Sequence, residues 1–223
     1  MTERPTTCRR FALVILILTL PLVSKAQVRL RPDEIERVDV IAIERDGRDL
    51  FAFDALTGRR STIRLEIGEE VRFERSRGRV GLVLTDRRAL GVAPGVGWQE
   101  LRYRLQEEAP DVGLVEDRLA VVVTGRRALG FLERGVWVEE RFTPHEFVAA
   151  FRVGSATGVV ATNRRALGLA PDLGHFVATD FHVKEELEAV TAHDTLITLR
   201  TNRRILVFSA PRGSWSEQKL RIH

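Results

Sequence analysis

The sequence predicts an all-β protein made of repeated four-stranded antiparallel units, and three observations support this fold class. A phrase centred on Arg-x-Leu returns five times, at a spacing of 38 to 40 residues. Short runs in which apolar and polar residues alternate lie between turn residues, as expected for half-buried strands. No stretch of 11 or more residues keeps a 3.6-residue period, so we expect very little helix.

The repeated phrase fixes the period before any single strand is assigned. A repeat of about 39 residues has room for four short strands and their turns. The last four copies extend to Thr-x-Arg-Arg-x-Leu, and the first copy is the most divergent. The five copies are centred on Arg48-Asp49-Leu50, Arg88-Ala89-Leu90, Arg127-Ala128-Leu129, Arg165-Ala166-Leu167 and Arg204-Ile205-Leu206.

Alternation and turn residues divide each unit into strands. In the second unit Leu101, Tyr103 and Leu105 share one face of the last expected strand. Asn or Gly in the turn before the repeated arginines favours a tight hairpin with positive φ. The expected strands are 71–75, 80–85, 88–93 and 98–105 in the second unit, and 112–115, 119–124, 128–132 and 137–142 in the third.

Four-stranded units of this length resemble the blades of a β-propeller. The resemblance covers nearly all of the chain after residue 26 and rests on period and strand count, without a named blade motif. The segment 209–215 resembles the aspartate-box turn of sialidase-like propellers but lacks the aspartate. The resemblance implies a single domain, 27–223, closed into a five-bladed ring. Its approximate blades are 28–68, 69–108, 109–145, 146–185 and 186–223.

The first 26 residues are expected to be a secretory signal peptide. Arg4, Arg9 and Arg10 precede the apolar run 11–22, and Ser24-Lys25-Ala26 is a small-x-small cleavage pattern. We therefore expect a periplasmic or secreted protein. An uncleaved signal segment is the alternative, and it would be the only membrane contact.

Composition after the signal excludes two classes of protein. Cys8 is the only cysteine, so the mature chain is no disulfide scaffold. The signal holds four of the 35 basic and one of the 31 acidic residues, which leaves 31 minus 30, or a net charge of +1. A nucleic-acid-binding surface needs a net basic face, so we expect no nucleic-acid partner.

Three features recur with the repeat and supply the candidate binding residues. Connections between second and third strands should lie at the same edge as links between units, which places arginine pairs and glutamate pairs together. They form either ion pairs that orient the blades or a cationic ring for an anionic glycan, lipid headgroup or peptide tail. The arginines are Arg87, Arg88, Arg126, Arg127, Arg164, Arg165, Arg203 and Arg204, and the glutamate pairs are 69–70, 107–108 and 185–186.

The third feature is an aromatic residue that opens the fourth strand of each unit. Such residues either pack between blades or stack on sugar rings. If Trp98, Trp137 and Trp215 are buried between blades, carbohydrate binding loses its support. The fourth aromatic is Phe176.

The sequence names no catalytic residue, no metal site and no cofactor. The five histidines are not at a metal-ligand spacing within one element, and Ser216-x-x-Lys219 lies in an expected strand. We therefore predict an exported, non-catalytic binding or scaffold module that recognises a protein or peptide through one face. The alternatives are carbohydrate binding through the per-blade aromatics and hydrolysis at a channel mouth.

Overall fold

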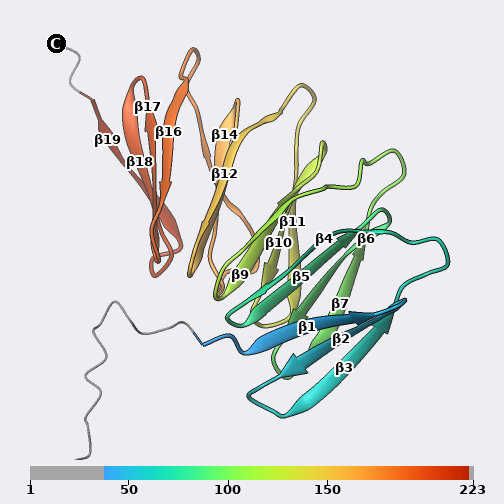
Figure 1. Cartoon of the computed structure of the whole chain (residues 1–223). Coiled ribbons are helices and arrows are strands. Elements are labelled where there is room, and N and C mark those ends of the chain that lie inside the picture. The colour runs from blue at the N-terminus through green and yellow to red at the C-terminus, as the bar shows by residue number, and fades with distance from the viewer. Residues whose placement is uncertain (1–37, 221–223) are drawn as a thin grey trace, which may run out of the picture. The chain divides into compact units, whose positions relative to one another are not determined.

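The computed structural model describes residues 38–220, and all regular secondary structure in this range is β-strand. The strands form five antiparallel sheets in chain order, each a simple up-and-down meander (Figure 1). The predicted signal 1–26 and the first strand expected in unit 28–68 lie outside the described residues. Strands β1 Ile41–Asp46, β2 Asp49–Asp54 and β3 Arg59–Arg64 form the first sheet; β4 Val71–Arg77, β5 Val80–Thr85, β6 Arg88–Ala93 and β7 Gly97–Arg102 the second; β8 Gly113–Val115, β9 Leu119–Val123, β10 Arg127–Leu132 and β11 Val136–Arg141 the third; β12 Val148–Gly154, β13 Thr157–Thr162, β14 Arg165–Leu169 and β15 Val177–Asp180 the fourth; and β16 Leu187–Ala192, β17 Leu196–Thr201, β18 Arg204–Ser209 and β19 Ser214–Lys219 the fifth.

The first copy of the repeated phrase is out of register with the others. Leu65 N–H donates to the carbonyl of Arg48 at 2.7 Å, as Tyr103 N–H donates to Arg87 at 3.1 Å. Arg48 therefore corresponds to Arg87, and Leu50 faces the opposite side of its sheet from Leu90, because a shift of one residue reverses a strand's faces. The alignment of Arg48-Asp49-Leu50 with the later copies was wrong by one residue.

The turn that carries the repeated arginines is not the positive-φ hairpin expected from its Asn and Gly residues. No residue of these turns has a positive φ among the described residues. Instead the hydroxyl of Thr85 accepts hydrogen bonds from the backbone N–H groups of Arg87 at 3.1 Å and Arg88 at 3.0 Å. The threonine of the phrase thus organises the turn. The same bonds recur at Thr124, Thr162 and Thr201.

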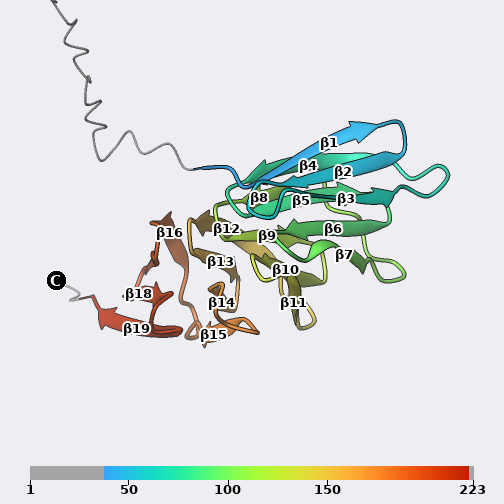
Figure 2. The ribbon, with the colours of Figure 1, turned by 90° about the horizontal axis from the view of Figure 1, so that it is seen from below.

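Successive sheets pack face to face, with corresponding strands in contact (Figure 2). All residues of the central strands β5, β6 and β10 are buried, so both faces of those strands are covered. Burial alternates along β17 and β18 of the last sheet, and along β2 of the first. Each terminal sheet therefore has one open face within the described residues. The structure shows a β-propeller-like stack, and closure into a ring stays a prediction.

A glycine in the third strand of a sheet receives a large side chain from the next sheet. A Cβ on Gly91 would lie 2.5 Å from the ring of Phe131, and one on Gly168 would lie 2.5 Å from the ring of Phe208. Both rings are fully buried. These glycines are needed for close approach of the sheets, not for a turn.

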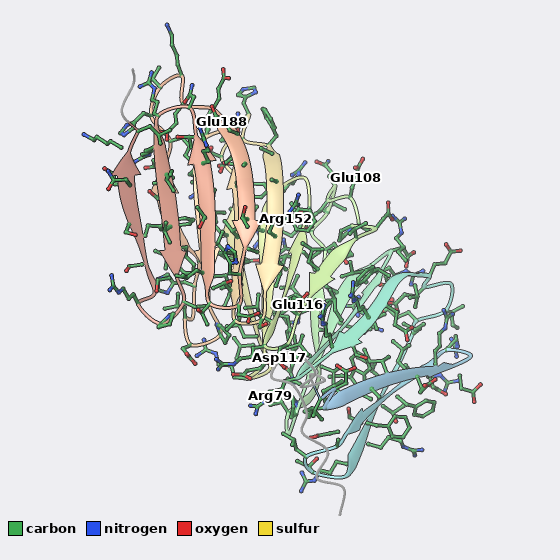
Figure 3. All side chains as sticks on the ribbon, turned by 60° about the vertical axis from the view of Figure 1, so that its left-hand side comes forward. Arg79, Glu108, Glu116, Asp117, Arg152 and Glu188 are labelled. Carbon is green, nitrogen blue, oxygen red and sulfur yellow. The ribbon has the colours of Figure 1, made fainter. Side chains whose placement is uncertain are left out.

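Backbone hydrogen bonds join successive sheets at the edge where first strands turn into second strands. Arg79 N–H donates to Asp117 O at 2.7 Å, Arg118 N–H to Ser155 O at 3.0 Å, and Ala156 N–H to Asp194 O at 2.7 Å. Figure 3 shows Arg79, Glu116 and Asp117 at this edge, with Glu108 and Glu188 toward the other. No helix among the described residues is long and apolar enough to cross a membrane.

Candidate binding edge

The turns that carry the arginines and the links between sheets lie together, as predicted. Glu70 N–H donates to Asp86 Oδ1 at 2.9 Å, and Asp86 N–H donates to Glu70 O at 3.0 Å. Equivalent bonds join Phe147 to Asn163. We call this the link edge. It consists of the turns 85–88, 124–127, 162–165 and 201–204 and the links 65–70, 103–108, 142–147 and 181–186.

The second arginine of each pair is a clamp between neighbouring sheets. Arg88 donates to both carboxylate oxygens of Glu69 at 2.9 Å and to the carbonyl of Arg64, in the preceding sheet, at 3.0 Å. It also pairs with Glu100. The guanidinium and the Glu69 carboxylate are almost completely buried. Corresponding pairs are Arg127–Glu107, Arg165–Glu146 and Arg204–Glu185.

These buried carboxylates are held in the ionised form. Burial alone would raise the pKa of Glu69, but hydrogen bonds from Arg88, from the backbone N–H of Glu66 and from Thr85 together lower it. The pKa values of Glu107, Glu146 and Glu185 are lowered by the same balance of burial and hydrogen bonds.

Each link contains a β-turn that ends at the buried glutamate. Glu107 N–H donates to Arg104 O at 3.0 Å, and Gln106, between them, has a φ of 64°. Positive φ at the third position only marks a type II turn, which favours glycine there. Gly68 satisfies this preference in the first link, while His145 (φ 63°) and Lys184 (φ 62°) do not.

The second position of these turns presents an apolar side chain to solvent. Ile67 is 83% exposed, Leu105 90% and Val183 83%. Pro144, exposed as well, takes this position in the third link. The turns are held by more than backbone bonds. The glutamate carboxylate also accepts from the first residue of the turn, for instance from Arg104 N–H at 2.8 Å. We call these four residues the turn tips.

The first arginine of each pair is the more accessible one. Arg87 pairs with Glu66 at 3.0 Å, and Arg164 donates to the hydroxyl of Thr143 at 3.4 Å. Arg126 and Arg203 have no carboxylate partner among residues 38–220. Arg126 lines a hollow of about 430 Å³ and Arg203 one of about 530 Å³. Ligand binding by the eight arginines stays a prediction, and these two are best placed for it.

The tryptophans lie half-buried between sheets. The indole Nε1–H of Trp98 donates to Ser61 O at 3.3 Å, that of Trp137 to Gln99 O at 3.2 Å, and that of Trp215 to Val177 O at 2.8 Å. Each acceptor is a carbonyl of the fourth strand of the preceding sheet, or of β3 in the first. The ring of Trp137 also lies 4.9 Å from that of Phe131. These residues serve packing, and they give carbohydrate binding no support.

Sequence reasoning missed several residues of the link edge. Glu146 belongs to the set of buried glutamates but was overlooked because Phe147 follows it and breaks the paired pattern. Its spacing of 39 residues from both Glu107 and Glu185 was the signal that could have found it. The turn tips have the same regular spacing, yet no single residue type recurs at the position. Within the described residues, no group of three His, Cys, Asp or Glu could hold a metal ion.

No family model matches the chain, and no curated protein sequence matches it. The structure is similar to solved β-propeller proteins at low identity. It matches the N-terminal domain of Nup159 at 10% identity and TM-score 0.37, over 81% of this chain and 58% of that one. The Neurospora crassa Pan2 WD40 domain matches at 12% identity and TM-score 0.33, over 82% and 63%. Prp20p from Saccharomyces cerevisiae matches at 7% and 0.40, over 77% and 55%. The chain thus spans less than two thirds of these proteins, and the likeness carries no argument about function.

Proposed function

We propose that the protein is an exported binding or scaffold module that recognises a protein or peptide partner through the link edge. The observation that carries this proposal is the row of turn tips, Ile67, Leu105, Pro144 and Val183. Exposed apolar side chains that gather on one surface mark interaction sites more often than isolated ones do. Here four come from one edge, one from each link.

The rigidity of the turns supports the same proposal. Each turn tip is followed by a residue with positive φ and by a glutamate fixed in a buried ion pair. Non-glycine residues with positive φ cost about 1 kcal/mol or more, and strain of this kind gathers at functional sites. A preformed surface loses little entropy when a partner binds. In the five-bladed ring predicted from the sequence, this edge would form one face of the ring.

Photo-crosslinking from single positions tests the proposal. A photoreactive amino acid replaces Leu105 or Val183 in the full-length protein, which is then mixed with extract of the source organism. Leu56, an exposed leucine between β2 and β3 on the opposite edge, is the matched control position. We expect one shared crosslinked partner from positions 105 and 183 and none from 56. Equal crosslinking from all three positions, or none from the turn tips, would rule the proposal out.

A further inference from the structure

The third sheet departs from the repeat at the start of its first strand. In the second and fourth sheets the first strand pairs with the second as far as the threonine of the turn, with Val71 opposite Thr85 and Val148 opposite Thr162. The fifth sheet does the same. In the third sheet β8 has three residues, and its pairing with β9 stops at Val122. The last residue of β9, Val123, therefore has no strand partner on the β8 side.

One residue accounts for this departure. After the threonine, the other turns carry Asp86, Asn163 or Asn202, whose side-chain oxygen accepts a backbone N–H at the start of the first strand at 2.9 to 3.1 Å. The third turn has Gly125 instead, and a Cβ there would meet nothing within 4 Å. Without this bond the chain leaves the sheet after the link. Arg72 of the second sheet holds it at Ala109 O.

The free stretch of β9 offers backbone hydrogen-bonding groups. Thr124 N–H donates to Arg127 O at 3.0 Å, so the next pair along the hairpin, Val123 and Ala128, is the kind without mutual hydrogen bonds. The N–H and C=O of Val123 therefore point away from β10, toward the side that β8 leaves open. Unpaired strand groups of this kind are where an added strand binds.

A hollow of about 560 Å³ lies beside this free stretch and is mostly apolar. Val112, Val123, Val148 and Phe151 line it, together with Arg152 of β12, which Figure 3 labels. The hollow of about 430 Å³ that Arg126 lines is its neighbour across the turn. The two share their walls, because Thr124 lines one and Gly125 the other, and Val148 lines one and Glu146 the other.

The charge of this region is positive and unbalanced. Among the described residues, Arg126 and Arg141 in the smaller hollow and Arg152 in the larger have no carboxylate partner. The acidic residue of the larger hollow, Asp111, is already bonded to Arg72 at 3.1 Å. A ligand with carboxylates would therefore meet free guanidinium groups, to which it makes charge-assisted hydrogen bonds.

We propose that the free stretch of β9 and these two hollows bind an extended, acidic peptide segment of the protein partner. The peptide backbone pairs with Val123, an apolar side chain fills the hollow between Val148 and Phe151, and a carboxylate reaches Arg126 and Arg141. This inference rests on the proposed function, since it names the partner's chemistry at one place on the link edge.

Selection from a random peptide library displayed on phage tests this site without knowledge of the partner. The full-length protein is the bait, and the affinities of selected peptides are then measured by fluorescence polarisation. We expect enriched peptides to combine acidic residues with alternating apolar ones. N-methylation of the peptide backbone should weaken binding. Failure to enrich any peptide, or enrichment without acidic residues, would overturn the proposal.

Two variants with a matched control locate the binding. Arg126→Ser should weaken binding about tenfold through the lost charge-assisted hydrogen bonds, whereas Arg164→Ser, at the same position of the next repeat, should leave it unchanged. Gly125→Asn supplies the side chain that the other turns have, and it should close the free stretch and abolish binding while the protein stays folded. Equal binding by Arg126→Ser and Arg164→Ser, or full binding by Gly125→Asn, would contradict the assigned site.

The outcomes separate the two proposals. If crosslinking from Leu105 and Val183 persists while peptide binding ignores Gly125 and Arg126, the link edge is the interface and the site on the third sheet is not. If the selected peptides depend on Gly125 and Arg126 but no crosslink forms from the turn tips, the peptide site stands and the wider surface fails.

Discussion

At the scale of single residues, the two arginines of the repeated pair have different roles. Arg127 is 3% exposed and forms a clamp with Glu107, Glu139 and the carbonyl of Arg102. Arg126, its neighbour in sequence, points into a hollow and has no carboxylate partner among the described residues. Identical residue types one position apart thus divide into structure and recognition.

We expect Arg127→Met to destabilise the protein by about 3 to 5 kcal/mol, because Glu107 would remain as an uncompensated buried charge. Arg126→Met is the matched control and should change stability by no more than about 0.5 kcal/mol. The double variant Arg127→Met, Glu107→Met should recover part of the loss. Urea unfolding of the three variants checks these values, and equal effects of the two single variants would contradict the clamp.

Tyr103 is a residue whose polar group has no partner. Its hydroxyl is the only buried side-chain polar atom without a hydrogen bond among the described residues. Burial raises the pKa of Tyr103, so the hydroxyl stays neutral. Phe142 and Phe181 take the same place at the start of later links, where each donates its N–H to an arginine carbonyl as Tyr103 does.

Tyr103→Phe should therefore stabilise the protein by about 1 kcal/mol, since it removes a buried group that lacks a partner. Thermal unfolding measures the change. Phe142→Tyr, the reverse exchange in the next repeat, should destabilise the protein and serves as the comparison. A clear loss of stability in Tyr103→Phe would show that the hydroxyl has a partner in solution.

At the scale of elements, the sheets are joined by a glycine that receives an aromatic ring. Gly91→Ala should destabilise by about 1 to 3 kcal/mol, because the ring of Phe131 has no room for a Cβ 2.5 Å away. The first junction contains the smaller version of this contact, with Ala52 packed near Val92. The double variant Gly91→Ala, Phe131→Val copies that pair and should recover stability. A single variant as stable as the parent would argue against the socket.

The sequence predicted the elements well where hydrogen-bonded hairpins repeat. The second and third strands of the second unit were placed at 80–85 and 88–93, their observed bounds. It misled where the letters matched but the turn differed. In the first sheet Asp46 pairs with Asp49 across two residues, whereas Leu84 pairs with Ala89 across four. That difference of two residues moved Leu50 to the other face, which no count of letters could show.

The candidate site was predicted only in part, for a physical reason. The shared edge of arginines and glutamates follows from strand direction, so the sequence could indicate it. The turn tips depend on a backbone conformation, positive φ, that Gln106, His145 and Lys184 do not announce. The free stretch at Val123 depends on one missing side chain, at Gly125. This glycine looked like one more hairpin residue.

At the scale of the whole molecule, the two open sheet faces lack the parts that join the other sheets. Val207 stands in the last sheet where Gly91 and Gly168 form sockets, by its place three residues after the clamping arginine. In the first sheet Asp49 takes the place of that arginine. A junction between the first and last sheets would therefore need contacts of another kind. Polar outer faces of this sort are usual in the terminal repeats of stacked proteins.

The clamps also tie the stability of the whole stack to pH. The pKa values of Glu69, Glu107, Glu146 and Glu185 are lowered in the folded protein, against an ordinary value of 4.5. A lowered folded pKa means that the unfolded chain binds protons first as the pH falls. The stabilisation is therefore complete above pH 4.5 and is lost as the pH falls through the lowered values.

We accordingly expect the melting temperature to be nearly constant from neutral pH down to about 5 and to fall steeply below it, as linkage requires for carboxylates that are paired in the folded state. Glu107→Gln removes one of the four titrating groups, so its melting temperature should start lower and fall less with acid. Glu108→Gln, the exposed neighbour, should follow the parent curve. Thermal unfolding monitored by circular dichroism across this range gives all three curves. A parent curve that stays flat through pH 4 would mean that the four clamps do not set the acid limit of the fold.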